Sequence, residues 1–100
     1  MFIGMLFIDC LLGQGHSLKE KRRHLLRLSQ KMRNNFNVAI GEVAGQNLWQ
    51  RSSLVILTVN TSREILRRNL EGIVKIMEGE PYFQLLSYKI KDLSLNHFIR

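Results

Sequence analysis

The chain has 100 residues, and its 15 lysines and arginines against 8 acidic residues give a formal net charge of +7 at pH 7. That length excludes a multidomain enzyme, and a single domain with 45% hydrophobic residues can bury a core without disulfides or a structural metal. One cysteine cannot form an internal disulfide, which is typical of a protein of the reducing cytoplasm. The basic balance favours an anionic partner, first nucleic acid and then an acidic membrane surface or an acidic protein.

The N-terminal residues 2–12 are apolar at nearly every position. Such a run is typical of a strand covered on both faces, and it is far shorter than the ~20 residues of a membrane span. It contains Asp9 and lacks a preceding basic region, so we expect neither a targeting segment nor a membrane anchor. After the break at Gly13–Gly15, Ser17–Glu20 matches a capping box and predicts a helix to about Asn35.

Two further strands follow this helix. In residues 37–44, Val38, Ile40 and Glu42 alternate with small residues, and residues 54–59 are apolar and partly β-branched. Both segments predict strands, joined by the loop 45–51. The capping-box pattern recurs at residues 61–64 and predicts a second helix, which Gly79 and Pro81 end.

Residues 82–91 predict a last strand, and residues 93–100 form a C-terminal tail without an assigned structure, so the domain covers residues 1–92. The order β-α-β-β-α-β, with right-handed crossovers, predicts a ferredoxin-like α+β fold. In that fold a four-stranded antiparallel sheet carries both helices on one face. Because this architecture hosts many unrelated functions, it selects none of them by itself.

A ridge of basic residues recurs every four positions along the first helix, opposite the apolar positions that predict its buried side. Like charges at this spacing destabilise an isolated helix by about 1 kcal/mol in total, and Glu20 is the helix's only acid. The ridge is either a solvated face screened by salt or a surface that binds phosphates. The ridge residues are Lys19, Arg23, Arg27 and Lys31, and the predicted nucleic-acid-binding set adds Lys21, Arg22 and Arg51.

Two basic residues of that set, Lys21 and Arg22, fall within the arc of the helix that faces the sheet. They either extend past the edge of the sheet to reach water or line its end beside Gly13, Gly15 and His16. In the second case the glycines and the first amides of the helix receive a phosphate. The Gly-x-Gly pattern matches neither the P-loop nor the dinucleotide fingerprint.

The first strand also has an apolar outer side. If its even-numbered residues face the helices, then Ile3, Met5 and Phe7 face outward as an exposed apolar patch. Such patches usually mark interfaces, so we expect a homodimer or larger oligomer through the open sheet face. The rival interpretation is an aromatic surface that stacks single-stranded RNA, but residues 53–59 contain no aromatic residue.

No catalytic or metal site is predicted. The three histidines do not pair with cysteine or carboxylates at metal-ligand spacings, and Cys10 lies in a predicted strand. Asp9 and Glu42 lack a neighbouring nucleophile or cofactor motif and fit solvated residues or salt-bridge partners. We therefore expect a non-catalytic protein with no cofactor and no small-molecule substrate.

Several short motifs resemble the YlxP-like family of small bacterial proteins of unknown function, over roughly residues 1–92. The resemblance implies a ferredoxin-like fold and a bacterial cytoplasmic setting, and its members tend to be encoded among translation and ribosome-maturation factors. It implies no established activity. The motifs are His16–Arg22, Gln46–Arg51, the opening Phe2-x-Gly4, and Phe36-Asn37-Val38.

The chain departs from the family pattern at two positions. Asn47 stands where an aspartate is usual, which argues against a role for a carboxylate there. Phe7 stands where a polar residue is expected on the outer face, which bears on oligomerisation. Trp49, within the second motif, either covers the open end of the sheet or belongs to a contact surface beside Arg51.

Two classes of function agree with these features. The first is a ribosome-associated or RNA-binding accessory factor, which meets the phosphates of ribosomal or other structured RNA without reading bases. The alternative is a protein-interaction module that docks an acidic partner and binds no nucleic acid.

Overall fold

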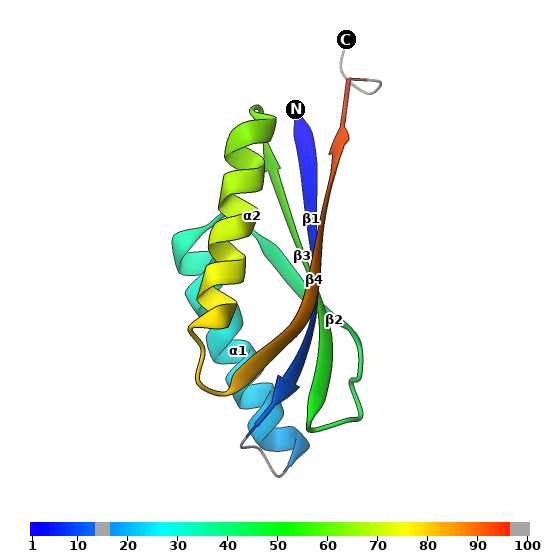
Figure 1. Ribbon diagram of the computed structural model, residues 1–100, viewed down its shortest axis with the longest axis vertical. Helices are drawn as coiled ribbons and strands as arrows, with labels where there is room; N and C mark the ends of the chain where they lie inside the picture. Colours follow the sequence, from blue (N-terminus) through cyan, green and yellow to red (C-terminus); the bar gives the residue numbers. More distant parts are fainter. Residues whose placement is uncertain (14–16, 97–100) are drawn as a thin grey trace.

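The computed structural model describes residues 1–13 and 17–96, in which four strands form one antiparallel sheet of order β2-β3-β1-β4 (Figure 1). Both helices cover the same face of this sheet, which confirms the predicted ferredoxin-like arrangement. The elements are β1 (Phe2–Leu12), α1 (Leu18–Asn35), β2 (Ala39–Ala44), β3 (Arg51–Asn60), α2 (Arg63–Glu78) and β4 (Phe83–Ser94).

The element ends differ from the sequence expectation where strand pairing extends polar segments. β3 begins at Arg51 instead of Leu54, because Arg51 pairs with Leu11 and the serines that follow pair with the next residues of β1. β4 runs on through Ser94, which pairs with Phe2 at the start of β1. Pairing with the long β1 therefore places segments of low strand propensity in the neighbouring strands.

Serine hydroxyls begin both helices. Ser17 accepts a hydrogen bond from the backbone N–H of Glu20, as the first capping box predicts. The second helix is capped by Ser62, which accepts from the N–H of Ile65, so it begins one residue later than the pattern starting at Thr61 indicates. Both helix starts are thus encoded locally.

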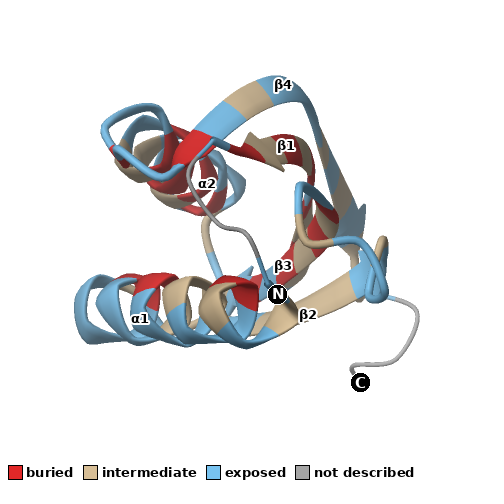
Figure 2. Ribbon diagram, turned by 90° about the horizontal axis from the view of Figure 1, so that it is seen from below, coloured by how far each residue is buried: buried red, intermediate tan, exposed pale blue. Residues whose placement is uncertain are grey.

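The core lies between the helices and the inner face of the sheet, where the buried residues gather (Figure 2). Alternate residues of β1 point into it, while α2 contributes an apolar side at helical spacing. The buried set includes Leu6, Ile8, Cys10 and Leu12 of β1, Leu54 and Ile56 of β3, Leu28 and Met32 of α1, and Leu66, Leu70, Ile73 and Met77 of α2.

The remaining residues of β1 lie on the outer face, which no described helix covers. Directly paired residues of an antiparallel sheet share a face, so the strand register defines rows across it. The rows are Val59–Ile3–Leu93, Leu57–Met5–Lys91, Val55–Phe7–Lys89 and Ser53–Asp9–Ser87.

One glycine of β1 allows α2 to pack closely on the sheet. A Cβ added to Gly4 would lie 2.8 Å from Leu70 Cδ1 and 2.9 Å from Leu66 Cγ, and Cγ sits too near the backbone to move freely. We expect Gly4→Ala to lower the unfolding free energy by about 1–3 kcal/mol in urea denaturation, as overpacking does. Gly41→Ala is the matched control, because a Cβ there meets nothing within 4 Å. Equal stability of the two variants would contradict this account of the packing.

Candidate nucleic-acid interface

The solvent side of α1 carries four basic side chains without an ion pair to any residue that the structure describes. At 100° per residue they fall within an arc of about 100°, and at 1.5 Å per residue they span about 21 Å along the helix. Leu26 and Gln30 lie between them on the same side. These residues, Lys19, Arg22, Arg23 and Arg33, are called the outward stripe below.

The other two residues of the predicted ridge turn toward α2. Each four-residue step advances about 40° around a helix, so Arg27 and Lys31 lie on a different side of α1 from Lys19. Arg27 Nη2 lies 2.8 Å from Glu80 Oε2, and Lys31 Nζ lies 3.1 Å from Glu80 Oε1. The structure therefore does not bring Lys19, Arg23, Arg27 and Lys31 together on one surface, and it sets Arg27 and Lys31 apart as partners of Glu80.

Glu80 is a buried carboxylate in the turn between α2 and β4, and its side chain is 1% exposed. Burial by itself raises the pKa of this group, but the hydrogen bonds from Arg27 and Lys31 outweigh it and hold the pKa of Glu80 below its ordinary value. The same junction stacks the rings of His24 and Tyr82 at 4.0 Å. Two cations against one carboxylate leave one net positive charge there.

Lys21 is buried, and this corrects its prediction as a nucleic-acid contact. Its side chain is 1% exposed, because it lies on the side of α1 that faces the sheet. Its ammonium neither reaches water past the sheet edge nor lines a phosphate site. Lys21 Nζ donates instead to three backbone carbonyls, those of Gly45 at 2.5 Å, Leu48 at 2.5 Å and Arg51 at 2.9 Å.

A carboxylate completes the surroundings of this ammonium. Glu42 Oε2 lies 2.6 Å from Lys21 Nζ and also accepts from the hydroxyl of Ser52 at 2.5 Å. The backbone carbonyl of Ser52 in turn lies 3.5 Å from Cys10 Sγ. Burial raises the pKa of the Cys10 thiol to about 11, even with Lys21 nearby, so the thiol stays protonated and unreactive at neutral pH.

Lys21 links the two longer family motifs, His16–Arg22 and Gln46–Arg51. It belongs to the first motif, and its carbonyl ligands lie in or beside the second, the 46–51 segment. Gly45 allows the loop to turn there, with φ of 81° and a Cβ position only 2.9 Å from the carbonyl oxygen of Arg51. The loop therefore wraps around a buried charge.

The remaining predicted site residues lie elsewhere. Arg51 pairs with Leu11, so its side chain lies on the outer sheet face and apart from the outward stripe. Trp49 is partly buried in its loop. The predicted phosphate site beside Gly15 and His16 falls outside the described residues. Arg33 joins the stripe although it was not in the predicted set, and its position on the arc is the signal that identifies it.

Two kinds of site find no support in the described parts of the chain. Within residues 1–13 and 17–96, no three His, Cys, Asp or Glu side chains come together as a metal site. Neither described helix is long and apolar enough to cross a membrane.

Comparisons with known proteins agree with the motifs. Residues 3–90 match the family described as "Protein of unknown function (DUF503)". The uncharacterized protein YlxP of Bacillus subtilis (strain 168) is 35% identical over 79 residues, which make up 79% of this chain and 86% of that protein. Each finding supports the resemblance to the YlxP-like family.

Two solved structures share the fold. The de novo designed protein Foldit4 has a TM-score of 0.52 at 12% identity, over 94% of this chain and 98% of that one. The Arabidopsis thaliana protein At3g17210 has a TM-score of 0.52 at 17% identity, over 94% of each chain. At these identities the likeness shows the fold alone.

The buried ammonium yields a direct test. We expect Lys21→Met to lower the unfolding free energy by about 3 kcal/mol or more, because it leaves the carboxylate of Glu42 and three carbonyls without their cation. Urea denaturation measures this change. Lys19→Met removes the same charge from the exposed side of α1 and should stay within about 0.5 kcal/mol of wild type. A small effect at Lys21 would show that water replaces the ammonium.

The pair with Glu80 yields a pH-dependent test. At neutral pH, Glu80→Gln should lower the unfolding free energy by about 1–2 kcal/mol, since it weakens charged hydrogen bonds from two partly exposed cations. Because folding lowers the pKa of Glu80, this stability is present above the unfolded-state pKa and is lost as the pH falls through the folded-state pKa. The difference between wild type and variant, followed by urea denaturation, should therefore shrink on acidification. A stability difference that stayed constant with pH would contradict this role of Glu80.

Proposed function

The chain belongs to the DUF503 family of proteins of unknown function, and we propose that it is a non-catalytic RNA-binding protein whose outward stripe contacts backbone phosphates. The observation that carries the proposal is four exposed cations on one side of α1 that no described acid neutralises. We propose ribosomal or other structured RNA as the partner and the cytoplasm as the compartment.

The chemistry of the stripe suits phosphates. Three of its four members are arginines, whose planar guanidinium groups donate two parallel hydrogen bonds to a phosphate. Lys19 lies in the first turn of α1, where the positive end of the helix dipole adds to the attraction for anions. Repulsion among these cations is relieved when a polyanion binds.

The stripe offers little with which to read bases. Leu26 and Gln30 are the neutral side chains between its cations, and the stripe holds no aromatic ring on which a base would stack. Phosphate contacts position a protein on nucleic acid without specifying sequence. The proposal therefore predicts binding that depends strongly on salt and weakly on RNA sequence.

Fluorescence anisotropy with a labelled RNA hairpin tests this function. If the four stripe residues meet about four phosphates, the logarithm of affinity should fall with the logarithm of salt concentration at a slope of roughly −3 to −4. Replacing Lys19, Arg22, Arg23 and Arg33 together with Gln should flatten that slope. The variant should keep or slightly raise the melting temperature, because like charges are removed and good helix formers remain.

A control variant distinguishes the effect of the stripe on RNA affinity from the effect of net charge. Replacing Arg51, Lys75, Lys89 and Lys91 with Gln removes the same number of exposed charges from other surfaces, none of them ion-paired with a described residue, and should leave most RNA affinity in place. Equal losses in the two variants would overturn the proposal. So would polyglutamate binding as tightly as RNA, a result that would favour the acidic-partner alternative.

A further inference from the structure

The outer face of the sheet combines an apolar centre with unpaired charges. Four of its apolar residues are large and well exposed, namely Phe7 at 39%, Leu57 at 40%, Val59 at 47% and Leu93 at 52%. Ile3 and Met5 lie half-buried among them. Isolated exposed apolar residues are common, but residues in three adjacent rows of one sheet form a contiguous patch.

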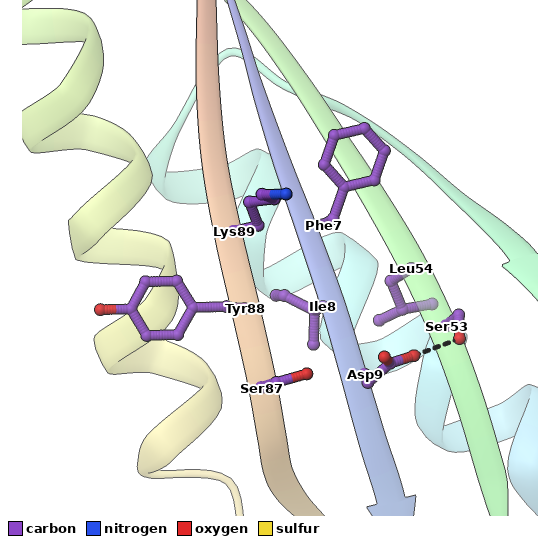
Figure 3. A pocket seen from close by; sticks show the side chains of 8 residues that line it. All are labelled: Phe7, Ile8, Asp9, Ser53, Leu54, Ser87, Tyr88 and Lys89. Atoms are coloured by element: carbon purple, nitrogen blue, oxygen red, sulfur yellow. Dashed lines mark hydrogen bonds between the residues drawn. The ribbon is translucent and has the colours of Figure 1, made fainter.

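A polar row borders this patch next to Phe7. Figure 3 shows Asp9, Ser53 and Ser87 beside a hollow of about 280 Å³ that Phe7 and Lys89 also line. Asp9 Oδ1 accepts a hydrogen bond from the Ser53 hydroxyl, which leaves most of the lone pairs of the carboxylate free for other donors.

Three charged side chains of this face form no ion pair with the residues that the structure describes. Asp9 forms no ion pair with a described residue, and neither do Lys89 and Lys91 on the neighbouring strand. Asp9 lies in the row on one side of Phe7 and Lys91 in the row on the other side, while Lys89 lies in the row of Phe7 itself. The rows of Asp9 and Lys91 are therefore complementary to each other in charge.

We propose that this face binds a second copy of the chain, face to face, about a two-fold axis near Phe7. An axis that crosses the strands at Phe7 exchanges the row on one side of it with the row on the other. The row of Met5 and Lys91 then lies over the partner's row of Asp9, and the reverse. Each copy places the ammonium of Lys91 near the partner's Asp9 and an apolar side chain over the hollow.

A second copy suits this face better than single-stranded RNA does. Phe7 is the only aromatic side chain in the four rows, and its neighbours on β3 are aliphatic, so bases would find one ring on which to stack. Aliphatic side chains are instead well matched by an identical surface. Because the helices lie on the other side of the sheet, the dimer leaves both outward stripes exposed, and the inference is independent of the proposed function.

The size of the patch indicates the strength of the dimer. The patch spans three strands about 4.8 Å apart and three rows about 7 Å apart, so it covers about 300 Å² on each copy. Specific interfaces typically bury about 800 Å² per partner, so this dimer lies at the weak end. We expect a dissociation constant in the micromolar range.

Sedimentation velocity from about 1 to about 200 µM tests this dimer, in the micromolar range expected for a small interface. Wild type should become dimeric across this range, while Phe7→Glu should remain monomeric with an unchanged melting temperature, because the side chain lies outside the core. Wild type that stays monomeric at the highest concentration would overturn the proposal. Binding of an unstructured oligonucleotide to monomeric wild type would also overturn the proposal, if Phe7→Glu abolished that binding.

A charge exchange tests the geometry. Asp9→Lys and Lys91→Asp should each weaken dimerisation about tenfold or more, since each places like charges together twice across the axis. An equimolar mixture of the two variants should recover the dimer, because each contact between positions 9 and 91 then joins a Lys to an Asp. Lys75→Asp on α2 is the control and should dimerise as wild type does. A mixture that stays monomeric would overturn the proposed axis.

A milder pair of variants protects the test against misfolding of Asp9→Lys. Asp9→Asn keeps the shape of the side chain and Lys91→Gln keeps a polar group, so each removes one charge without reversing it, and circular dichroism checks their fold. If the two residues pair across the interface, the double variant should lose no more dimer affinity than the single variant with the larger loss. Strictly additive losses would contradict the pairing.

Discussion

The ammonium of Lys21 is the interaction on which one end of this structure depends. A buried charge is tolerated only when oxygens replace its water, and here three backbone carbonyls and the carboxylate of Glu42 do so. The carbonyls come from Gly45, Leu48 and Arg51, so one side chain of α1 determines the path of the loop between β2 and β3. The loop in turn delivers Arg51 to the start of β3, beside β1.

A second buried charge divides the basic surface of α1. Glu80 binds Arg27 and Lys31, and these ion pairs link α1 to the turn that follows α2. The cations that remain form the outward stripe, which faces solvent along the length of α1. The seven basic residues of one helix thus act in three ways: one organises a loop, two bind a carboxylate, and four stay available for an anionic partner.

The two exposed surfaces, the outward stripe and the apolar rows around Phe7, lie on opposite sides of the sheet. The stripe belongs to the helical layer, whereas the apolar rows around Phe7 belong to the open face. A face-to-face dimer through the open face would carry two stripes pointing away from each other. Such a dimer would present the proposed phosphate-binding surface twice, which would favour a long or folded polyanion over a short one through effective concentration.

The order of the elements, the cap at Ser17 and the outward direction of Phe7 follow from the sequence alone, because hydrophobic period and capping are local properties. The second cap is predicted one residue too early, since the structure caps α2 with Ser62 and not with Thr61. The sequence also placed Lys21 correctly on the side of α1 that faces the sheet, but it placed Arg22 there too, and Arg22 is exposed on the outward stripe. Only the tertiary structure decided the partners of the charged residues: Lys21 meets carbonyls 24 to 30 residues away, and Arg27 meets a carboxylate 53 residues away. Strand register likewise brought Lys89 beside Phe7. Ion pairing depends on which distant segments come together, and no periodicity within one helix contains that information.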